Sequence, residues 1–346
     1  MRYKIIFTVT LLFCSIIFLS AITGWMSGPL VKKEAEIRKA VSRSLVLLEQ
    51  SGYAFTNNAM LRCASCHHNT LLAMAAGIAR EKGLTTNDTL TAHRIAAMER
   101  TLDRGCNPNK IDEFITGANL IIPYVLLGLH AEKYPPGPVT DMAVDYICSQ
   151  ARTDGSFLSE SGRPPIETGD IHLTAMAIHS IQLYASSAKA QKVQGLVAKT
   201  KQWIEHAKPN QHQELVFQLL GMHWCGSPMN EKMKLAAMLK ATQRADGGWA
   251  QLPTMKSDAY ATGEALYALF ESGTVKTSDK SYQKGIDFLL GTQDSEGAWI
   301  VATRAYAIQP FVNSQFPPYD ENQFISAAAS NWATIALLNA LPDKAK

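Results

Sequence analysis

The stretch KGIDFLLGTQDSEGAW, Lys284 to Trp299, decides the fold of this chain. It joins a helix-like apolar segment to a short acidic turn that starts with glutamine, contains glycine and ends in tryptophan. Related turns begin at Gln243 (QRADGGW) and Gln150 (QARTDGSF). Gln243 and Gln293 lie 50 residues apart, a period that indicates a repeated pair of helices.

Each of these turns lies between two helix-like segments, and the second segment is rich in small residues that permit close packing. Aligned on their Ala/Leu periodicity, Thr174 matches Thr262. Chain breakers such as EKYPPGPVT divide the sequence into further units that lack the signature. We count six units and little sign of strands, with an ordinary helical bundle as the alternative; the units are 34–85, 90–133, 138–187, 191–226, 231–275 and 280–341.

Residues 284–299 resemble the QW motif of squalene–hopene cyclases along its whole length. The other two copies are degenerate, because Leu235 stands where glycine or alanine is expected and Phe157 replaces the tryptophan. The resemblance covers residues 34–341. It implies an all-α fold, the α/α toroid of terpenoid cyclases and protein prenyltransferase β subunits, in which six inner and six outer helices enclose a central cavity.

The repeat register predicts that several polar side chains meet at one rim of the toroid, where the inner helices begin. Gln50 takes the glutamine position of the first repeat, so that CASCHHN, residues 63–69, starts the first inner helix. Helix N-termini at this rim would favour anionic groups. The predicted rim residues are Cys63, Cys66, His67, Asp170, His172, His212, Asp258 and Tyr260.

The segment CASCH is the pattern to which haem is covalently attached. Thiols at Cys63 and Cys66, one helical turn apart, would add to the haem vinyl groups, and His67 would be the proximal iron ligand. Arg304 is a candidate partner for a haem propionate or for a rim carboxylate. We therefore expect a covalent c-type haem.

Three alternatives to haem stay open. The first is a metal site of thiolate and imidazole ligands, with zinc as the metal and His67, His172 and His212 as candidate ligands. The resemblance also implies zinc, since prenyltransferases hold it in their cavity through Asp, Cys and His. The second is a disulfide between Cys63 and Cys66, and the third is no function at all.

The rim lacks the acid motif of cyclases that protonate an alkene, Asp-x-Asp-Asp, and the chain has no paired-aspartate run for a diphosphate. The remaining catalytic candidates are isolated groups, namely Asp170, His172, Asp258 and Tyr260. A desolvated carboxyl group can act as a general acid. Aromatic residues make up only 8% of the chain, which is modest for a pocket that stabilises carbocations.

The first 30 residues differ from the rest. Ile5 to Ile22 has no charged residue and follows Arg2 and Lys4, which predicts a membrane anchor or, as the alternative, a cleaved signal. Either one places the toroid outside the cytoplasm, on the periplasmic side. The net charge of +3 and the lack of basic blocks argue against a nucleic-acid partner. A disulfide Cys106–Cys148 or Cys148–Cys225 is compatible with export.

Two functions follow from these features. The first is a membrane-anchored redox protein or oxidoreductase with covalent haem, a redox partner and an apolar or lipid-like substrate in the toroid. The alternative is a non-redox, terpenoid cyclase-like or prenyltransferase-like enzyme, or an isoprenoid binder, with a Cys/His metal site. An exported scaffold with a filled cavity is the third interpretation.

Overall fold

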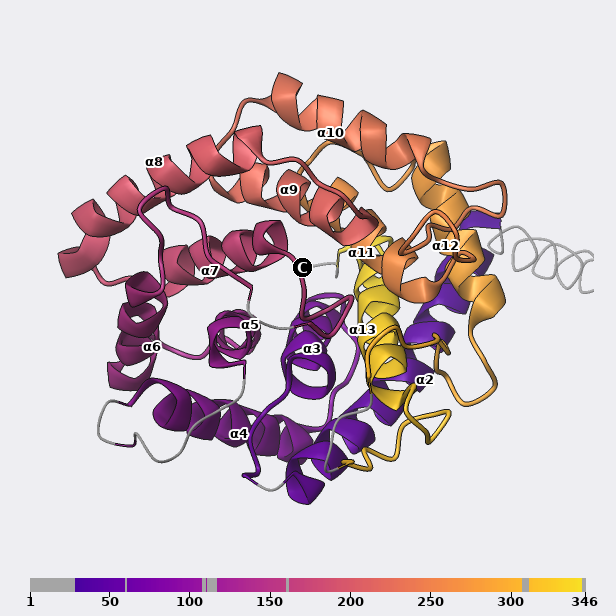
Figure 1. Cartoon of the computed structure of the whole chain (residues 1–346). Coiled ribbons are helices and arrows are strands. Elements are labelled where there is room, and N and C mark those ends of the chain that lie inside the picture. Colours follow the sequence, from indigo (N-terminus) through magenta and orange to yellow (C-terminus); the bar gives the residue numbers. More distant parts are fainter. Residues whose placement is uncertain are drawn as a thin grey trace, which may run out of the picture.

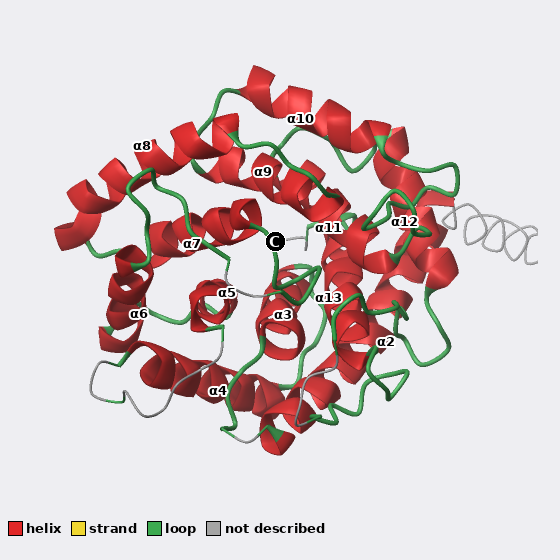
Figure 2. Ribbon diagram, in the orientation of Figure 1, coloured by secondary structure: helices red, strands yellow, loops and turns green. Residues whose placement is uncertain are grey.

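The computed structural model of the chain describes residues 29–59, 61–107, 110, 117–159, 162–306 and 311–343. These residues form helices and loops, with isolated bridges but no strand of a sheet (Figure 2). No helix in these ranges is both long and apolar enough to cross a membrane. The predicted anchor, residues 5–22, lies outside the described residues.

Six helices form an outer ring and six form an inner ring, and the chain alternates between them (Figure 1). The outer helices are α2 (Pro29–Asn58), α4 (Asp88–Cys106), α6 (Pro138–Ser149), α8 (Ala190–His206), α10 (Met229–Ala241) and α12 (Lys280–Thr292). The inner helices are α3 (Leu71–Glu81), α5 (Ala118–Ala131), α7 (Asp170–Tyr184), α9 (His212–Trp224), α11 (Ala259–Glu271) and α13 (Gln323–Asn339). This arrangement confirms the predicted α/α toroid.

The glutamine-to-tryptophan turns are the corners at which an outer helix leads to the next inner helix. Trp249 is fully buried, and its indole Nε1 donates to the carbonyl of Leu239 at 2.8 Å. Gly247 has φ +89°, and a Cβ there would lie 2.5 Å from the carbonyl oxygen of Lys284. Trp299 and Gly297 repeat these features in the last corner.

The degenerate corner that begins at Gln150 uses the same backbone hydrogen bond as the corner that begins at Gln243. The backbone N–H of Phe157 donates to Thr174 Oγ1, and that of Trp249 donates to Thr262 Oγ1, both at 2.9 Å. The alignment of these two threonines is therefore confirmed, and phenylalanine can replace tryptophan because the anchor is the backbone. Gln293 closes the ring, since its side-chain amide donates to the carbonyl of Ala40 on α2 at 2.9 Å.

The first repeat departs from this pattern. Gln50 is exposed within α2, which continues to Asn58, so the predicted glutamine corner is wrong there. The inner helix is entered instead through a π-helical turn, η1 (Cys66–Thr70), which is capped by the Ser65 hydroxyl. The long α2 spans the whole wall of the toroid, and its extra turns replace the corner.

Candidate functional site

The start of the inner helices forms one end of the toroid, which we call the rim. A buried chain of polar side chains crosses it. Tyr260 donates from its hydroxyl to Gln213 Oε1 at 2.7 Å, and Gln213 Nε2 lies 2.9 Å from His172 Nδ1. Nε2 of His172 lies 2.8 Å from the hydroxyl of Tyr124. These contacts link four inner helices and fill the space between them.

His172 in this chain is neutral. Burial lowers the pKa of its imidazole to about 3, and its Nδ1 faces an amide donor. Nδ1 also lies 3.3 Å from the carbonyl oxygen of Thr168, and Nε2 shares a hydrogen bond of 2.8 Å with the hydroxyl group of Tyr124. The amide of Gln213 orients His172 and Tyr260, and because an amide does not exchange protons readily, the chain is a positioning network rather than a proton relay.

Glu264 lies beside this network with both carboxyl oxygens buried and without a hydrogen-bond partner among the described residues. The nearest imidazole is that of His212, whose Nε2 lies 3.6 Å from Oε1 and donates to the carbonyl of Ala261. Burial, followed by the charge of Asp258, holds the pKa of Glu264 well above its ordinary value. This direction of the shift favours the protonated, uncharged form of the Glu264 carboxyl group.

Asp258 caps α11, accepting from the backbone N–H of Ala261 at 2.9 Å. Burial raises its pKa to about 6. The amide of Gln251 bridges it to Arg304, with Nε2 to Asp258 Oδ2 at 3.1 Å and Oε1 to Arg304 Nε at 2.9 Å. Arg304 is thus linked to Asp258 through the amide of Gln251, and its direct pairing with a rim carboxylate stays a prediction.

His67 and His68 lie in an aromatic cluster at the same end. The ring of Phe55 stacks on His68 with centroids 4.9 Å apart, and Phe324 lies 4.9 Å from His67. Nε2 of His67 and both ring nitrogens of His68 have no hydrogen-bond partner in the described part of the chain. Burial lowers the pKa of His67 to about 3 and that of His68 well below 6.5.

The residues of the predicted haem site do not fit a haem in this arrangement. Cys66 is 1% exposed, and Cys63 lies in the irregular segment before the π-helical turn, not one helical turn away from Cys66. The cavity beside His67 has a volume of about 50 Å³, whereas pockets that hold a drug-sized ligand measure roughly 300–1,000 Å³. Covalent attachment stays a prediction of the sequence motif alone.

The zinc set is not assembled either. Within the described ranges, no three His, Cys, Asp or Glu side chains gather as a possible metal-binding group. His67, His172 and His212 are held apart by their separate contacts with the aromatic cluster, Gln213 and the carbonyl of Ala261. The five described cysteines are all free thiols, so none of the three disulfides considered from the sequence, Cys63–Cys66, Cys106–Cys148 and Cys148–Cys225, is formed in this structure.

Asp170 belongs to a different surface. Its carboxylate accepts from the backbone N–H of Ser159 at 2.9 Å, and the side chain faces an outer groove beside α8. The rim therefore unites His172, Tyr260, Asp258 and Arg304. Cys66 and Glu264 both lie near enough to Tyr260 for their ionised forms to raise its pKa, which puts the cysteine close to this group.

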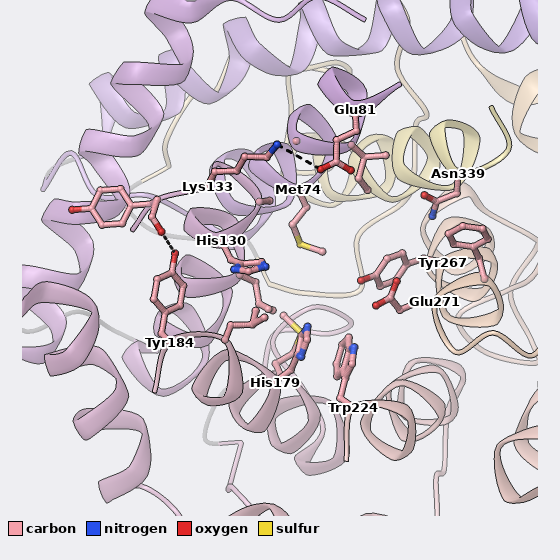
Figure 3. A pocket seen from close by; sticks show the side chains of 18 of the residues that line it. Met74, Glu81, His130, Lys133, His179, Tyr184, Trp224, Tyr267, Glu271 and Asn339 are labelled. Atoms are coloured by element: carbon pink, nitrogen blue, oxygen red, sulfur yellow. Dashed lines mark hydrogen bonds and ion pairs between the residues drawn. The ribbon is translucent and has the colours of Figure 1, made fainter. Parts of the chain in front are cut away.

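A cavity opens at the opposite end, where the inner helices finish; we call this end the mouth (Figure 3). Its volume is about 910 Å³ (Figure 3). Every inner helix contributes to its walls. Seven aromatic side chains line it: Tyr134, Tyr184, Phe217, Trp224, Tyr267, Phe270 and Trp332. An apolar ligand in this cavity would therefore lie against aromatic side chains.

Two histidines join this wall. His179 stacks on Trp224 with ring centroids 4.1 Å apart and planes 2° apart, and burial lowers its pKa to about 3. His130 meets the edge of Tyr184 at 6.2 Å. Figure 3 shows both imidazoles on the cavity wall, with His179 next to Trp224. At neutral pH, His179 is an uncharged aromatic surface.

Helix α11 connects the two ends. Tyr260, Glu264, Tyr267 and Glu271 are spaced by four, three and four residues, which places them on one face of the helix. Tyr267 and Glu271 line the cavity. Glu264 therefore lies about one helical turn, roughly 4.5 Å of rise, beneath the cavity-lining Tyr267.

Sequence reasoning missed the cavity residues and Glu264. His130 and His179 stand in apolar helices without a motif, and no spacing distinguishes them. Glu264 could have been found, because it is the only charged residue within AYATGEALYALF, a buried inner helix that predicted packing alone. A lone carboxyl group in such a helix indicates either a partner or a neutral acid.

The fold and the cavity together define the class of structure, a terpenoid cyclase-like α/α toroid. The type II terpene cyclase MstE from Scytonema, in complex with geranylgeranyl dihydroxybenzoate as substrate, superposes with a TM-score of 0.59 at 12% identity over 90% of this chain and 99% of the cyclase. The apo form of MstE gives 0.58 at 11% identity, over 89% and 99%. A protein from Actinoplanes gives 0.56 at 12% identity, over 88% and 99%.

At these identities the likeness concerns the fold. No protein-family model matches the sequence, and no curated protein matches it significantly.

Proposed function

We propose that this protein binds an isoprenoid-like apolar molecule in the mouth cavity and is a non-redox protein of the terpenoid cyclase type. The observation that carries the proposal is the cavity of about 910 Å³ with seven aromatic rings in its wall. Its size is that of a pocket for a ligand of several hundred daltons. Solved MstE complexes hold a geranylgeranyl substrate and a merosterolic acid product in the same fold.

The open volume at the two ends of the toroid favours the non-redox function over the haem-dependent one. The rim offers His67 a cavity of about 50 Å³ and is crossed by packed polar side chains. The mouth offers the apolar volume that the ligand needs. The metal site that accompanied the non-redox interpretation is not part of the proposal.

The acid for this chemistry is Glu264. Burial favours the neutral form of its carboxyl group, whose oxygens have no hydrogen-bond partner among the described residues, and it lies one turn beneath the cavity wall. A desolvated carboxylic acid can donate a proton to an alkene, and aromatic faces such as those of Tyr267 and Trp332 stabilise the cation that results. The carboxylate left behind would be stabilised by the positive charge of Arg304.

Ligand binding is tested with geranylgeraniol, followed by the fluorescence of the native tryptophans. Met74→Trp places a larger side chain in the cavity and should weaken binding at least tenfold. Met233→Trp makes the same change on the exposed outer wall of α10 and should leave binding unchanged. Equal affinity of the two variants would show that the mouth cavity is not the binding site.

The acid is tested separately by incubation with geranylgeranyl-bearing aromatic acids in deuterated water. Turnover should give a product of cyclised carbon skeleton with one deuterium bound to carbon. Glu264→Gln should abolish that incorporation while it keeps geranylgeraniol affinity within about twofold. Incorporation by Glu264→Gln at the normal rate would remove Glu264 from this role.

A further inference from the structure

The direction of the inner helices gives the mouth an electrostatic sign. The backbone carbonyl groups in the last turn of a helix carry partial negative charge, so the C-terminal end of a helix favours cations. The last residues of all six inner helices line the mouth cavity, namely Glu81, Ala131, Tyr184, Trp224, Glu271 and Asn339. The wall of the cavity therefore favours a positively charged group over a negatively charged one.

The charged side chains of the wall have the same sign in excess. Three carboxyl groups and two ammonium groups line the cavity. Lys82 Nζ lies 2.7 Å from Asp343 Oδ1, and Lys133 Nζ lies 4.0 Å from Glu81 Oε1. The third carboxyl group, that of Glu271, makes no hydrogen bond and no ion pair with any residue that the structure describes. Both lining cations are thus paired, and Glu271 is left without a counter-ion.

A further ammonium group, that of Lys232, lies behind the wall and does not line the cavity. Its Nζ lies 3.3 Å from the carbonyl oxygen of Ser272 and 3.3 Å from Nδ1 of His223. Burial lowers the pKa of His223, the charge of Lys232 lowers it further and that of Glu271 raises it, so the imidazole lies near both charges. A cation that pairs directly with Glu271 would therefore have to come from the cavity.

Aromatic rings lie around the carboxyl group of Glu271. Tyr267 precedes Glu271 by four residues on the same face of α11, and burial, followed by the charge of Glu271, raises the pKa of Tyr267 well above its ordinary value. The ring of Tyr267 lies 5.3 Å from that of Trp332, measured between centroids. Figure 3 shows Tyr267, Glu271 and Trp224 around one part of the cavity. Aromatic faces of this kind bind quaternary ammonium ions.

We propose that the ligand of the mouth cavity carries a positive charge at one end of its apolar chain, as a quaternary ammonium or protonated amine, and that Glu271 binds this group. Glu271 supplies the counter-charge, and the faces of Trp224 and Tyr267 contact the carbon atoms around the nitrogen. The inference rests on the proposed function, because it needs an apolar ligand in the mouth. The charge belongs to the ligand as it binds and does not depend on proton transfer from Glu264.

The charge is tested with two ligands of the same shape, N,N,N-trimethylgeranylgeranylammonium and the neutral isostere in which carbon replaces the nitrogen. Both are titrated into the full chain in one neutral detergent, and binding is followed by the fluorescence of the native tryptophans. Glu271→Gln removes the negative charge and keeps the size of the side chain. Glu231→Gln is the matched control, because Glu231 precedes Lys232 on α10 at the same end of the toroid but does not line the cavity.

Wild-type protein should bind the ammonium ligand at least about tenfold more tightly than the isostere. Glu271→Gln should reduce this ratio to about threefold or less and leave the affinity for the isostere unchanged, whereas Glu231→Gln should keep the ratio.

Equal affinity of wild-type protein for the two ligands would overturn the inference and leave the proposed function standing. An unchanged ratio in Glu271→Gln, or an equal reduction in Glu231→Gln, would also overturn it, because the preference would then not come from Glu271. If neither ligand binds, the proposed function fails together with the inference.

Discussion

The two ends of the toroid contrast in what fills them. At the rim, the side chains of Tyr124, His172, Gln213 and Tyr260 form a connected, buried network that leaves little open volume. At the mouth, side chains from all six inner helices surround about 910 Å³ of space. The repeat thus builds a rigid closed end from hydrogen bonds and leaves the other end free for a ligand.

This contrast predicts where stability lies. Trp299→Ala at a rim corner removes a fully buried indole and its hydrogen bond to Leu289, so the free energy of unfolding should fall by about 3–5 kcal/mol. Trp224→Ala at the mouth removes a partly exposed indole whose N–H has no partner among the described residues, and the loss should be less than half as large. Urea unfolding of both variants checks the difference, and equal losses would contradict it.

The second prediction compares two tyrosines on one face of α11. Tyr260→Phe leaves the carbonyl of Gln213 without its donor, so it should destabilise the protein by about 1–3 kcal/mol. Tyr267→Phe changes a hydroxyl group in the cavity wall that makes no hydrogen bond to a described residue, and its effect on stability should be within about 0.5 kcal/mol. Thermal unfolding distinguishes the two. A larger effect of Tyr267→Phe would reverse the assignment of the ends.

The third prediction concerns pH. The folded state keeps His172 neutral with a pKa near 3, and in the unfolded state its pKa returns to about 6.5. Between these values the unfolded state binds more protons, so stability falls as the pH drops below 6.5. His172→Gln should flatten this fall by up to about 1.4 kcal/mol for each pH unit. Unfolding free energies at pH 6, 5 and 4 give the slope, and an unchanged slope would mean that His172 is charged in the folded protein.

The smallest expected effect on stability concerns an exposed ion pair at the edge of the mouth cavity. Lys133 and Glu81 lie 4.0 Å apart, and their side chains are 79% and 62% exposed (Figure 3). Water and salt screen such a pair, so Lys133→Ala should change stability by no more than about 0.5 kcal/mol. A loss of unfolding free energy above about 2 kcal/mol would show that this exposed pair stabilises the protein as much as the buried contacts of the rim do.

The repeat made most of the fold predictable from the sequence. The glutamine, glycine and tryptophan of residues 284–299 each make a specific contact in the corner, so their spacing reports the geometry directly. The absence of a corner in the first repeat was not predictable. Gln50 has the spacing of a corner glutamine, but it lies in a helix that continues for two more turns. Helix continuation depends on packing between α2 and the last repeat, which is remote in sequence.

The candidate site was predictable only in part. The register correctly placed His172, Asp258 and Tyr260 at the starts of inner helices. It could not show that Gln213 and Tyr124 would join them and fill the rim, because hydrogen bonds between distant helices leave no pattern in the sequence. The mouth cavity was not predicted for a related reason. Its volume depends on how six inner helices, far apart in the sequence, are arranged around it.

The central claim is that the mouth, not the rim, holds the apolar ligand. The most direct measurement is photolabelling of the full-length protein with a diazirine-bearing geranylgeraniol, followed by identification of the labelled residues by mass spectrometry. The account predicts labels on Met74, Trp224 and Tyr267 in the cavity, and their loss when unlabelled geranylgeraniol competes. Competable labels confined to the rim, on His67 or Phe324, would contradict it.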